Sequence, residues 1–162
     1  MTDLEVDYAL LVAQTEALCD GESDALANLA NVSALIYNTL PNVNWAGFYL
    51  MRRGELVLGP FQGQSACVRI PVGSGVCGTA VSERRVQRVS DVHDFPGHIA
   101  CDAASESEIV FPLSRAGKIV GVLDVDSPVK DRFSEDDEKG LYEIVCVIEK
   151  VLNEDVRSLG LT

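Results

Sequence analysis

A cysteine and three acidic residues near the middle of the chain have the types and the spacing to do chemistry. Cys101 lies seven residues before Glu108, which begins an apolar run. Asp124 and Asp126 lie at the end of the following apolar run, which starts at Ile119. A thiolate is a nucleophile, and a carboxylic acid crowded by other carboxylates has a raised pKa and can donate a proton. The pattern therefore predicts a hairpin with a nucleophile at its entrance and acids at its open end. The alternative is that Asp124 and Asp126 simply end a strand in water, because structural acids often mimic sites.

Whether the acids meet depends on the hairpin that carries them, whose turn lies in Ser114–Lys118. A three-residue loop, Arg115-Ala-Gly117, would use the backbone freedom of its glycine. That loop would pair Glu108 with Asp124 and place both on one face with Asp126. A two-residue loop would slip the register by one residue and move Glu108 to the other face. We predict the three-residue loop.

Three acids on one face of a sheet repel one another. Either water screens their charges, or the negative charge serves to bind a cationic ligand or to share a proton. The acids also create a conflict, since carboxylates near Cys101 should raise the pKa of its thiol and reduce the thiolate fraction. Backbone N–H groups of residues 102–105, if they form a helical turn, are one candidate for offsetting that effect.

The other cysteines do not form a recognisable disulfide framework. Five cysteines is an odd number, and no Cys-x-x-Cys occurs. Cys67 is either a small buried residue of a strand or a redox thiol. Cys77 falls in the first turn of a short helix, where the helix dipole is expected to lower the pKa of a thiol. Cys19 and Cys146 have the pattern of small apolar residues at helix edges.

No bound metal or cofactor is predicted. His93 and His98 share a loop with Cys101, but their spacing matches no zinc pattern. The glycine-rich stretch 73–78 resembles a phosphate loop only superficially, because no lysine follows in the required position.

Composition indicates one globular domain over residues 1–162. The chain has 162 residues, 47% of them apolar and 23% charged, with a formal net charge of −12. The negative charge disfavours nucleic acids and anionic membranes as partners. No apolar run reaches the roughly 18 residues of a membrane span, and the N-terminus has no signal-peptide pattern, so we expect a cytoplasmic protein.

Hydrophobic periodicity predicts an α+β fold. The expected helices are 3–19, 23–40, 76–84 and 134–156, and the expected strands are 44–50, 56–58, 67–70, 86–89 and the two arms of the hairpin 107–126. Trp45 and Tyr49 share one face of the first strand. Because hairpin links dominate, we expect a mainly antiparallel central sheet of about six strands flanked by helices. A long loop, 90–105, delivers Cys101.

This order of elements, with several motifs, resembles a GAF domain and more closely the GAF-fold free methionine-(R)-sulfoxide reductases. The resemblance covers about residues 15–152. The stretches that carry it are Asn44-Trp-Ala-Gly-Phe-Tyr49, Gly59-Pro-Phe-Gln-Gly63, Cys67, Gly73-Ser-Gly-Val-Cys-Gly78, Asp91-Val92, Pro96-Gly-His-Ile-Ala-Cys101, Ser105-Glu-Ser-Glu-Ile-Val110 and Gly121-Val-Leu-Asp-Val-Asp-Ser127. The Gly-Val-Leu-Asp strand is generic to GAF domains. The three cysteines together with Ser-Glu-Ser-Glu are specific to the reductases.

The resemblance implies roles for the site residues. Cys101 would be the nucleophile, Cys67 the principal resolving thiol and Cys77 an additional or alternative one. Residues Glu108, Asp124 and Asp126 would hold the polar end of the substrate and the sulfoxide oxygen, and Trp45 and Tyr49 would border the methyl group. The substrate would be free methionine-(R)-sulfoxide. Thioredoxin would regenerate the enzyme, with NADPH supplied through thioredoxin reductase.

Two other functions stay open from the sequence. One is a GAF module that binds a small ligand and signals. The other is a sensor of peroxide or nitric oxide in which oxidation of Cys101 is the signal. The N-terminal helices also present apolar stripes that would allow a homodimer.

Overall fold

The computed structural model describes residues 5–99, 103–154 and 159, and in these it confirms the predicted order of elements. The helices are α1 (Tyr8–Cys19), α2 (Ala25–Thr39), α3 (Gly75–Glu83) and α4 (Glu135–Glu154). The strands are β1 (Trp45–Arg52), β2 (Glu55–Gly63), β3 (Arg69–Pro71), β4 (Gln87–Val89), β5 (Ser107–Arg115) and β6 (Lys118–Ser127). A short 3-10 helix spans Val92–Asp94.

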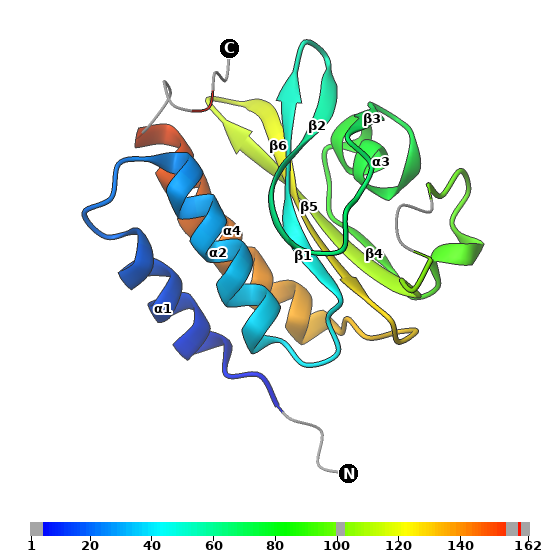
Figure 1. Ribbon diagram of the computed structural model, residues 1–162, viewed down its shortest axis with the longest axis horizontal. Coiled ribbons are helices and arrows are strands. Elements are labelled where there is room, and N and C mark those ends of the chain that lie inside the picture. Colours follow the sequence, from blue (N-terminus) through cyan, green and yellow to red (C-terminus); the bar gives the residue numbers. More distant parts are fainter. Residues whose placement is uncertain (1–4, 100–102, 155–158, 160–162) are drawn as a thin grey trace.

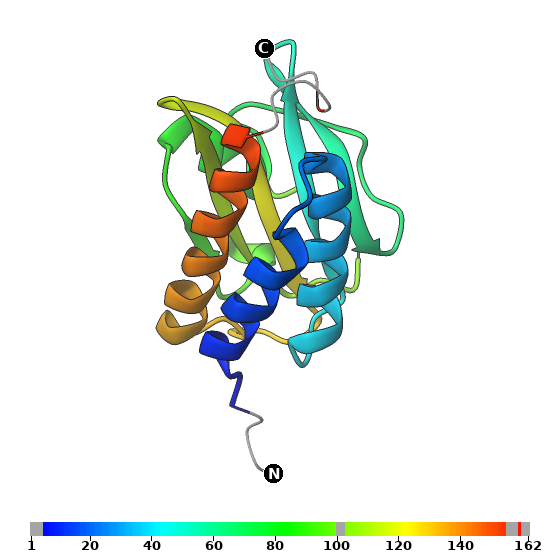
Figure 2. The same ribbon diagram turned by 90° about the vertical axis from the view of Figure 1, so that its left-hand side faces the viewer.

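One six-stranded sheet divides the molecule into two sides. Its strand order is β3-β2-β1-β6-β5-β4, and the neighbouring strands pair antiparallel, as predicted. Helices α1, α2 and α4 lie on one side and α3 on the other (Figure 1). Figure 2 shows α1 as an outer layer over α2 and α4, which pack on the sheet. None of the described helices is long and apolar enough to cross a lipid bilayer.

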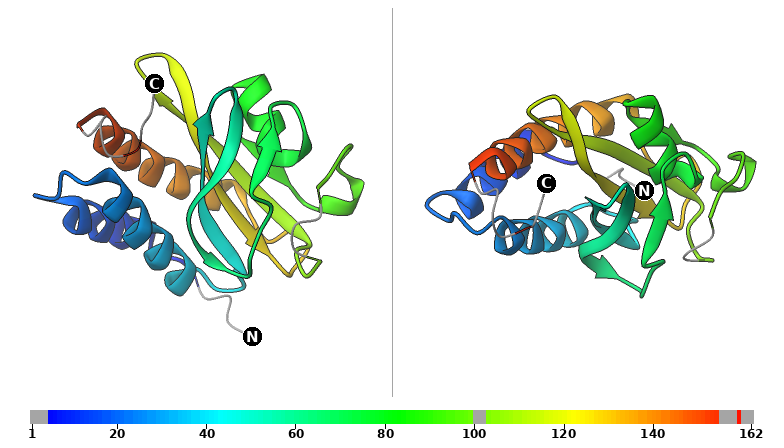
Figure 3. Two further views of the ribbon diagram at one scale, coloured as in Figure 1. Left: turned by 45° about the horizontal axis from the view of Figure 1, so that its top comes forward. Right: turned by 90° about the horizontal axis from the view of Figure 1, so that it is seen from above.

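Each face of the sheet has its own apolar core, because side chains alternate along a strand. On β1, Phe48 and Leu50 join the core under α2 and α4, whereas Trp45 and Tyr49 join the core under α3. Residues 90–99, which follow β4, lie on the α3 side (Figure 3). The α3 side is therefore the side on which the predicted binding aromatics lie.

Several predicted boundaries were wrong. Helix α1 begins at Tyr8 rather than residue 3, because the Asp7 side chain accepts a hydrogen bond from the Leu10 N–H and caps the helix there. Strand β2 does not end at Gly59-Pro60 but continues to Gly63 through a register shift against β1. A bulge is where a sheet tolerates proline, which lacks an N–H.

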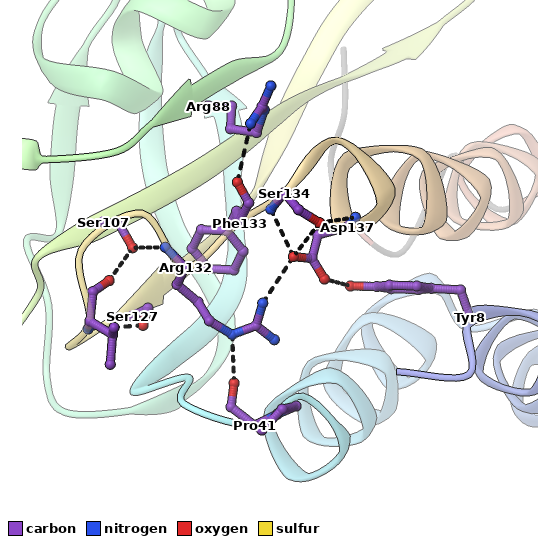
Figure 4. A network of polar contacts seen from close by, with 10 residues as sticks. Tyr8, Pro41, Arg88, Ser107, Ser127, Arg132, Phe133, Ser134 and Asp137 are labelled. Atoms are coloured by element: carbon purple, nitrogen blue, oxygen red, sulfur yellow. Dashed lines mark hydrogen bonds and ion pairs between the residues drawn. The ribbon is translucent and has the colours of Figure 1, made fainter. Parts of the chain in front are cut away.

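A polar network ties α1 to the start of α4 (Figure 4). The Asp137 carboxylate accepts hydrogen bonds from the Tyr8 hydroxyl at 2.6 Å and the Ser134 N–H at 2.8 Å. Arg132 pairs with Asp137 at 2.9 Å and also donates to the carbonyl of Pro41. Burial raises the pKa of Asp137, but these hydrogen bonds and the Arg132 charge outweigh it and hold that pKa below its ordinary value. The Asp137 N–H donates in turn to the Ser134 hydroxyl, so the two residues form a capping box at the start of α4.

Candidate active site

The β5–β6 hairpin turns differently from the prediction. Its loop has two residues, Ala116 and Gly117, with φ of 49° and 78°, and Arg115 faces Lys118. Positive φ at both positions is the type I′ geometry that matches the twist of the flanking strands. The predicted three-residue loop and the predicted pairing of Glu108 with Asp124 are therefore wrong.

The shared face of the acids is nevertheless correct, because a bulge restores it. Between the pairs Ser114–Ile119 and Leu113–Gly121 the register shifts, with one extra residue on β6. The shift offsets the slip that the two-residue loop introduces. Glu108 consequently faces Asp126 across the strands. Asp124, two residues before Asp126, projects to the same side.

A pocket on the α3 side of the sheet gathers most of the predicted site residues. It is lined by Trp45, Tyr49, Ala66, Ile70, Ser74, Gly75, Val76, Cys77, His98, Ile99, Ser105, Glu108, Asp124 and Asp126. Cys67 is not among the lining residues, although its neighbour Ala66 is. Cys101, predicted as the nucleophile, lies outside the described residues.

The acids of this pocket are buried and crowded. Glu108 is 7% exposed and Asp124 5%. Burial, and then the charges of Asp124 and Asp126, raise the pKa of Glu108 well above its ordinary range. Burial also raises the pKa of Asp124, but hydrogen bonds from Glu108 and Cys77 oppose that rise. The pKa values of both carboxyls are thus raised, that of Glu108 the more strongly, which favours Glu108 as the holder of a shared proton.

One oxygen of Asp124 has no partner. Its Oδ2 atom accepts from the Cys77 thiol at 3.3 Å, whereas its Oδ1 atom is buried without a hydrogen bond. An unsatisfied buried carboxylate oxygen is unfavourable, and a ligand that donates a hydrogen bond there would relieve it.

The prediction that α3 lowers the pKa of Cys77 is contradicted. Cys77 does lie in the first turn of α3, but its side chain is only 4% exposed. Burial, followed by the charges of Asp124 and Glu108, raises the pKa of this thiol well above its ordinary value. Burial and the nearby carboxylates therefore outweigh the helix dipole, and Cys77 is a protonated hydrogen-bond donor.

The other cysteines occupy distinct environments. Cys67 is half-buried in the connection between β2 and β3, and it is disulfide-bonded. Cys19, Cys77 and Cys146 are free thiols. Cys19 packs against the core beneath the helices, as expected of a small apolar residue, whereas Cys146 is exposed.

The aromatic residues of β1 form one wall of the pocket. The Trp45 and Tyr49 rings stack with centroids 5.9 Å apart, and Phe61 stacks on the other side of Trp45 at 5.2 Å. Both polar atoms reach the β2–β3 connection. The Trp45 indole N–H donates to the carbonyl of Gln64 at 3.1 Å, and the Tyr49 hydroxyl donates to the carbonyl of Cys67 at 2.9 Å.

The start of α3 forms another part of the pocket wall, a feature that the sequence analysis missed. Ser74, Gly75 and Val76 line the pocket there. The N–H groups of a first helical turn have no acceptor within the helix, and the Ser74 side chain makes no capping bond. Gly75 has φ of 62°, and a Cβ at this position would lie 3.2 Å from the Ile99 side chain. The glycine thus lets the Ile99 side chain pack against the start of α3. The glycine-rich stretch 73–78 was the signal in the sequence for this feature.

His98 was predicted as an ordinary loop residue, but it lines the pocket. Burial lowers its pKa, so that the imidazole is neutral over a wider pH range than usual. Its place three residues before Cys101 was the available signal.

Among the residues that the structure describes, two groups of side chains have donor types suited to a cation. One atom each from Cys77, Glu108 and Asp124 lie within 4.8 Å of one another, and so do atoms of Asp91, His93 and Glu106. In the second group, Asp91 is already paired with Lys130 at 2.8 Å, which favours an ion-pair role for it. In the first, the thiol donates to Asp124 and needs no metal to explain its position.

Comparisons with known proteins agree with this geometry. A family profile described as "GAF domain" matches residues 27–145. The free methionine-R-sulfoxide reductase of Escherichia coli is 61% identical over 145 residues, which cover 90% of this chain and 88% of that protein. The structure of reduced fRMsr from Staphylococcus aureus superposes with a TM-score of 0.90 at 55% identity, covering 92% of this chain and 97% of that one.

A second solved structure, the free methionine-R-sulfoxide reductase of Neisseria meningitidis in complex with its substrate, superposes with a TM-score of 0.89 at 42% identity. It covers 93% of this chain and 91% of its own. The chain therefore belongs to the GAF domain family and, within it, to the free methionine-(R)-sulfoxide reductases.

Proposed function

We propose that this chain reduces free L-methionine-(R)-sulfoxide to methionine. The observation that carries the proposal is a buried acid cluster with one unpartnered carboxylate oxygen, facing a stacked aromatic wall. The printed names of the E. coli and N. meningitidis relatives, the latter solved with its substrate, support the same activity.

The pocket offers a partner for each part of this substrate. The Asp124 Oδ1 atom, which lacks a hydrogen bond, would accept one from the ammonium group, with the negative charge of Asp126 nearby. The first turn of α3 would receive the carboxylate, because its N–H groups and the helix dipole favour an anion. Trp45 and Tyr49 would contact the S-methyl group through their polarisable faces. Methionine sulfoxide within a protein has neither terminal charge, so this arrangement favours the free amino acid.

Glu108 would be the proton donor. A sulfoxide oxygen must gain a proton before sulfur is attacked, and Glu108 is the carboxyl group whose raised pKa keeps it neutral. Cys77 would support this role indirectly. By donating its thiol hydrogen to Asp124, it helps Asp124 to stay ionised beside a protonated Glu108.

The nucleophile of the proposed reaction is Cys101. Its thiolate attacks the sulfoxide with Glu108 supplying a proton, so that the oxygen ends on Cys101 as a sulfenic acid and methionine leaves. The Cys67 thiol then attacks that sulfenic acid, a disulfide forms and water is released. The disulfide-bonded state of Cys67 supports its part as the resolving thiol. The buried position and raised pKa of Cys77 argue against a resolving role for Cys77 equal to that of Cys67.

An external dithiol would complete the cycle. We propose thioredoxin, reduced by NADPH through thioredoxin reductase, and a cytoplasmic location where that system operates. A homodimer formed through the N-terminal helices stays a prediction. Leu10, Leu18 and Leu26 are exposed on α1 and its neighbour α2, which is consistent with such an interface.

A coupled assay tests the proposal. With thioredoxin, its reductase and NADPH, the protein is expected to consume NADPH when given free L-methionine-(R)-sulfoxide, and not when given the S epimer. Cys101→Ser is expected to abolish reduction, whereas Cys67→Ser is expected to permit one stoichiometric turnover. Ligand binding without NADPH consumption would favour the sensor function instead. Activity of Cys101→Ser would show that the nucleophile is misassigned.

A further inference from the structure

The connection between β2 and β3 is fastened to the substrate pocket by the two aromatic residues of β1. Residues 64–68 have no regular secondary structure, and they carry Cys67. The Trp45 indole N–H bonds the carbonyl of Gln64 at one end of the connection. The Tyr49 hydroxyl bonds the carbonyl of Cys67 itself at 2.9 Å. At the far end, the Val68 carbonyl accepts from the Leu58 N–H.

The two donor residues are more buried than the segment to which they donate. Trp45 and Tyr49 are each 2% exposed and sit in a strand paired on both sides, whereas Gln64 and Ser65 are exposed. A hydrogen bond donated from a buried, ordered ring restricts the backbone of the exposed segment that accepts it. Burial, and then the charge of Asp124, raise the pKa of Tyr49, so its hydroxyl remains a donor throughout the working pH range.

We propose that Tyr49 is a positioning residue for the resolving thiol, in addition to lining the substrate pocket. Its hydroxyl holds the main chain of Cys67 in the place from which the Cys67 sulfur reaches its disulfide partner. This inference rests on the proposed function, in which Cys67 resolves the sulfenic acid of Cys101. In that step the S–O bond of the sulfenic acid breaks and the S–S bond forms. The thiol hydrogen leaves with the hydroxyl group as water, and no further oxidant is consumed.

The ring and the hydroxyl of Tyr49 act in different steps of the proposed reaction. The Tyr49 ring, stacked on Trp45, contacts the substrate and acts in sulfoxide reduction. The Tyr49 hydroxyl acts only afterwards, through the backbone of Cys67. Removal of the hydroxyl with retention of the ring should therefore slow resolution more than it slows sulfoxide reduction.

The variant Tyr49→Phe tests this separation. Reduced protein is mixed with one equivalent of methionine-(R)-sulfoxide, and methionine and disulfide are followed separately by rapid quench. The rate of disulfide formation relative to the rate of methionine formation is expected to fall about two- to tenfold, the range for loss of one neutral hydrogen bond. A sulfenic-acid trap such as dimedone should label Cys101 more in Tyr49→Phe than in wild type. Tyr37→Phe, on the opposite side of the sheet, is the matched control and should change neither rate.

Hydrogen peroxide separates this inference from the proposed function. Peroxide oxidises the Cys101 thiolate to the sulfenic acid without any sulfoxide, so resolution can be measured even if the protein reduces no methionine sulfoxide. Slower disulfide formation in Tyr49→Phe under peroxide supports the inference in either case. Disulfide formation at the wild-type rate under peroxide overturns it, as does a loss confined to methionine formation. If Tyr49→Phe misfolds, Trp45→Phe removes the anchor at Gln64 and is expected to show slower resolution under peroxide.

Discussion

Replacement of Glu108 by glutamine separates the proton that we assign to this residue from its shape. The variant keeps the size of the side chain and its ability to donate to Asp124, but it has no acidic proton. Loss of a positioned general acid reduces a rate by about 10²- to 10⁴-fold. That range corresponds to about 2.7 to 5.4 kcal/mol at 1.36 kcal/mol per factor of ten. We expect the loss in the rate of methionine formation, with substrate affinity changed much less.

The pH dependence of stability gives an independent measurement. The pKa of Glu108 is raised above its ordinary value of 4.5 in the folded protein, so the folded state binds this proton more tightly than the unfolded state. The resulting stabilisation is complete below about pH 4.5 and is lost as the pH rises through the raised pKa. Above that pKa, the Glu108 charge faces Asp126 directly across the strands. Glu108→Gln should then be the more stable protein by about 0.2 to 1 kcal/mol.

Single-turnover methionine formation and urea unfolding between pH 5 and pH 9 check both expectations. The matched control is Glu106→Gln, which changes the same residue type two positions earlier, outside the pocket lining. A Glu108→Gln protein that forms methionine at the wild-type rate would refute the assignment of the proton donor. A stability difference that does not grow with pH would refute the raised pKa.

Three further outcomes follow from contacts elsewhere. Gly140→Ala should destabilise the protein by about 1 to 3 kcal/mol in urea unfolding, because a Cβ there would lie 2.1 Å from the Tyr8 ring; a gain in stability, usual for this change within a helix, would show that α1 docks differently. Tyr8→Phe should cost about 1.5 to 3 kcal/mol in the same measurement through the lost bond to Asp137, and an unchanged unfolding midpoint would contradict that contact. Cys77→Ser should still form the disulfide after one turnover, whereas failure to do so would restore the resolving role of Cys77.

Local signals in the sequence were sufficient for the order of elements. Each helix and strand has apolar residues at its own period, and Ser134 and Asp137, three residues apart, cap the start of α4. The alternation on β1 also placed Trp45 and Tyr49 on one face. These features depend on residues that are close to one another in the sequence, so they can be predicted without the fold.

The sequence predicted which residues form the site better than it predicted how they are arranged. Glu108, Asp124 and Asp126 share a face as expected, but through a two-residue turn and a compensating bulge rather than through the predicted loop. Nothing local in the β6 sequence specifies that bulge, because the register is set by which side chains the whole sheet buries. A prediction from the turn alone was right about the face and wrong about the pairing.

By itself, the sequence determined the order of elements, the faces of the strands and the residue types available for chemistry, since these follow from local periodicity. Only the tertiary structure decided how the chemistry is distributed. The helix dipole predicted an acidic Cys77 thiol, but burial beside Asp124 raises its pKa instead. The hydrogen bond from the Tyr49 hydroxyl to the Cys67 carbonyl was also not predictable from the sequence, because Cys67 lies in a connection without regular structure. Burial, charge and long-range hydrogen bonds arise only when distant segments are brought together.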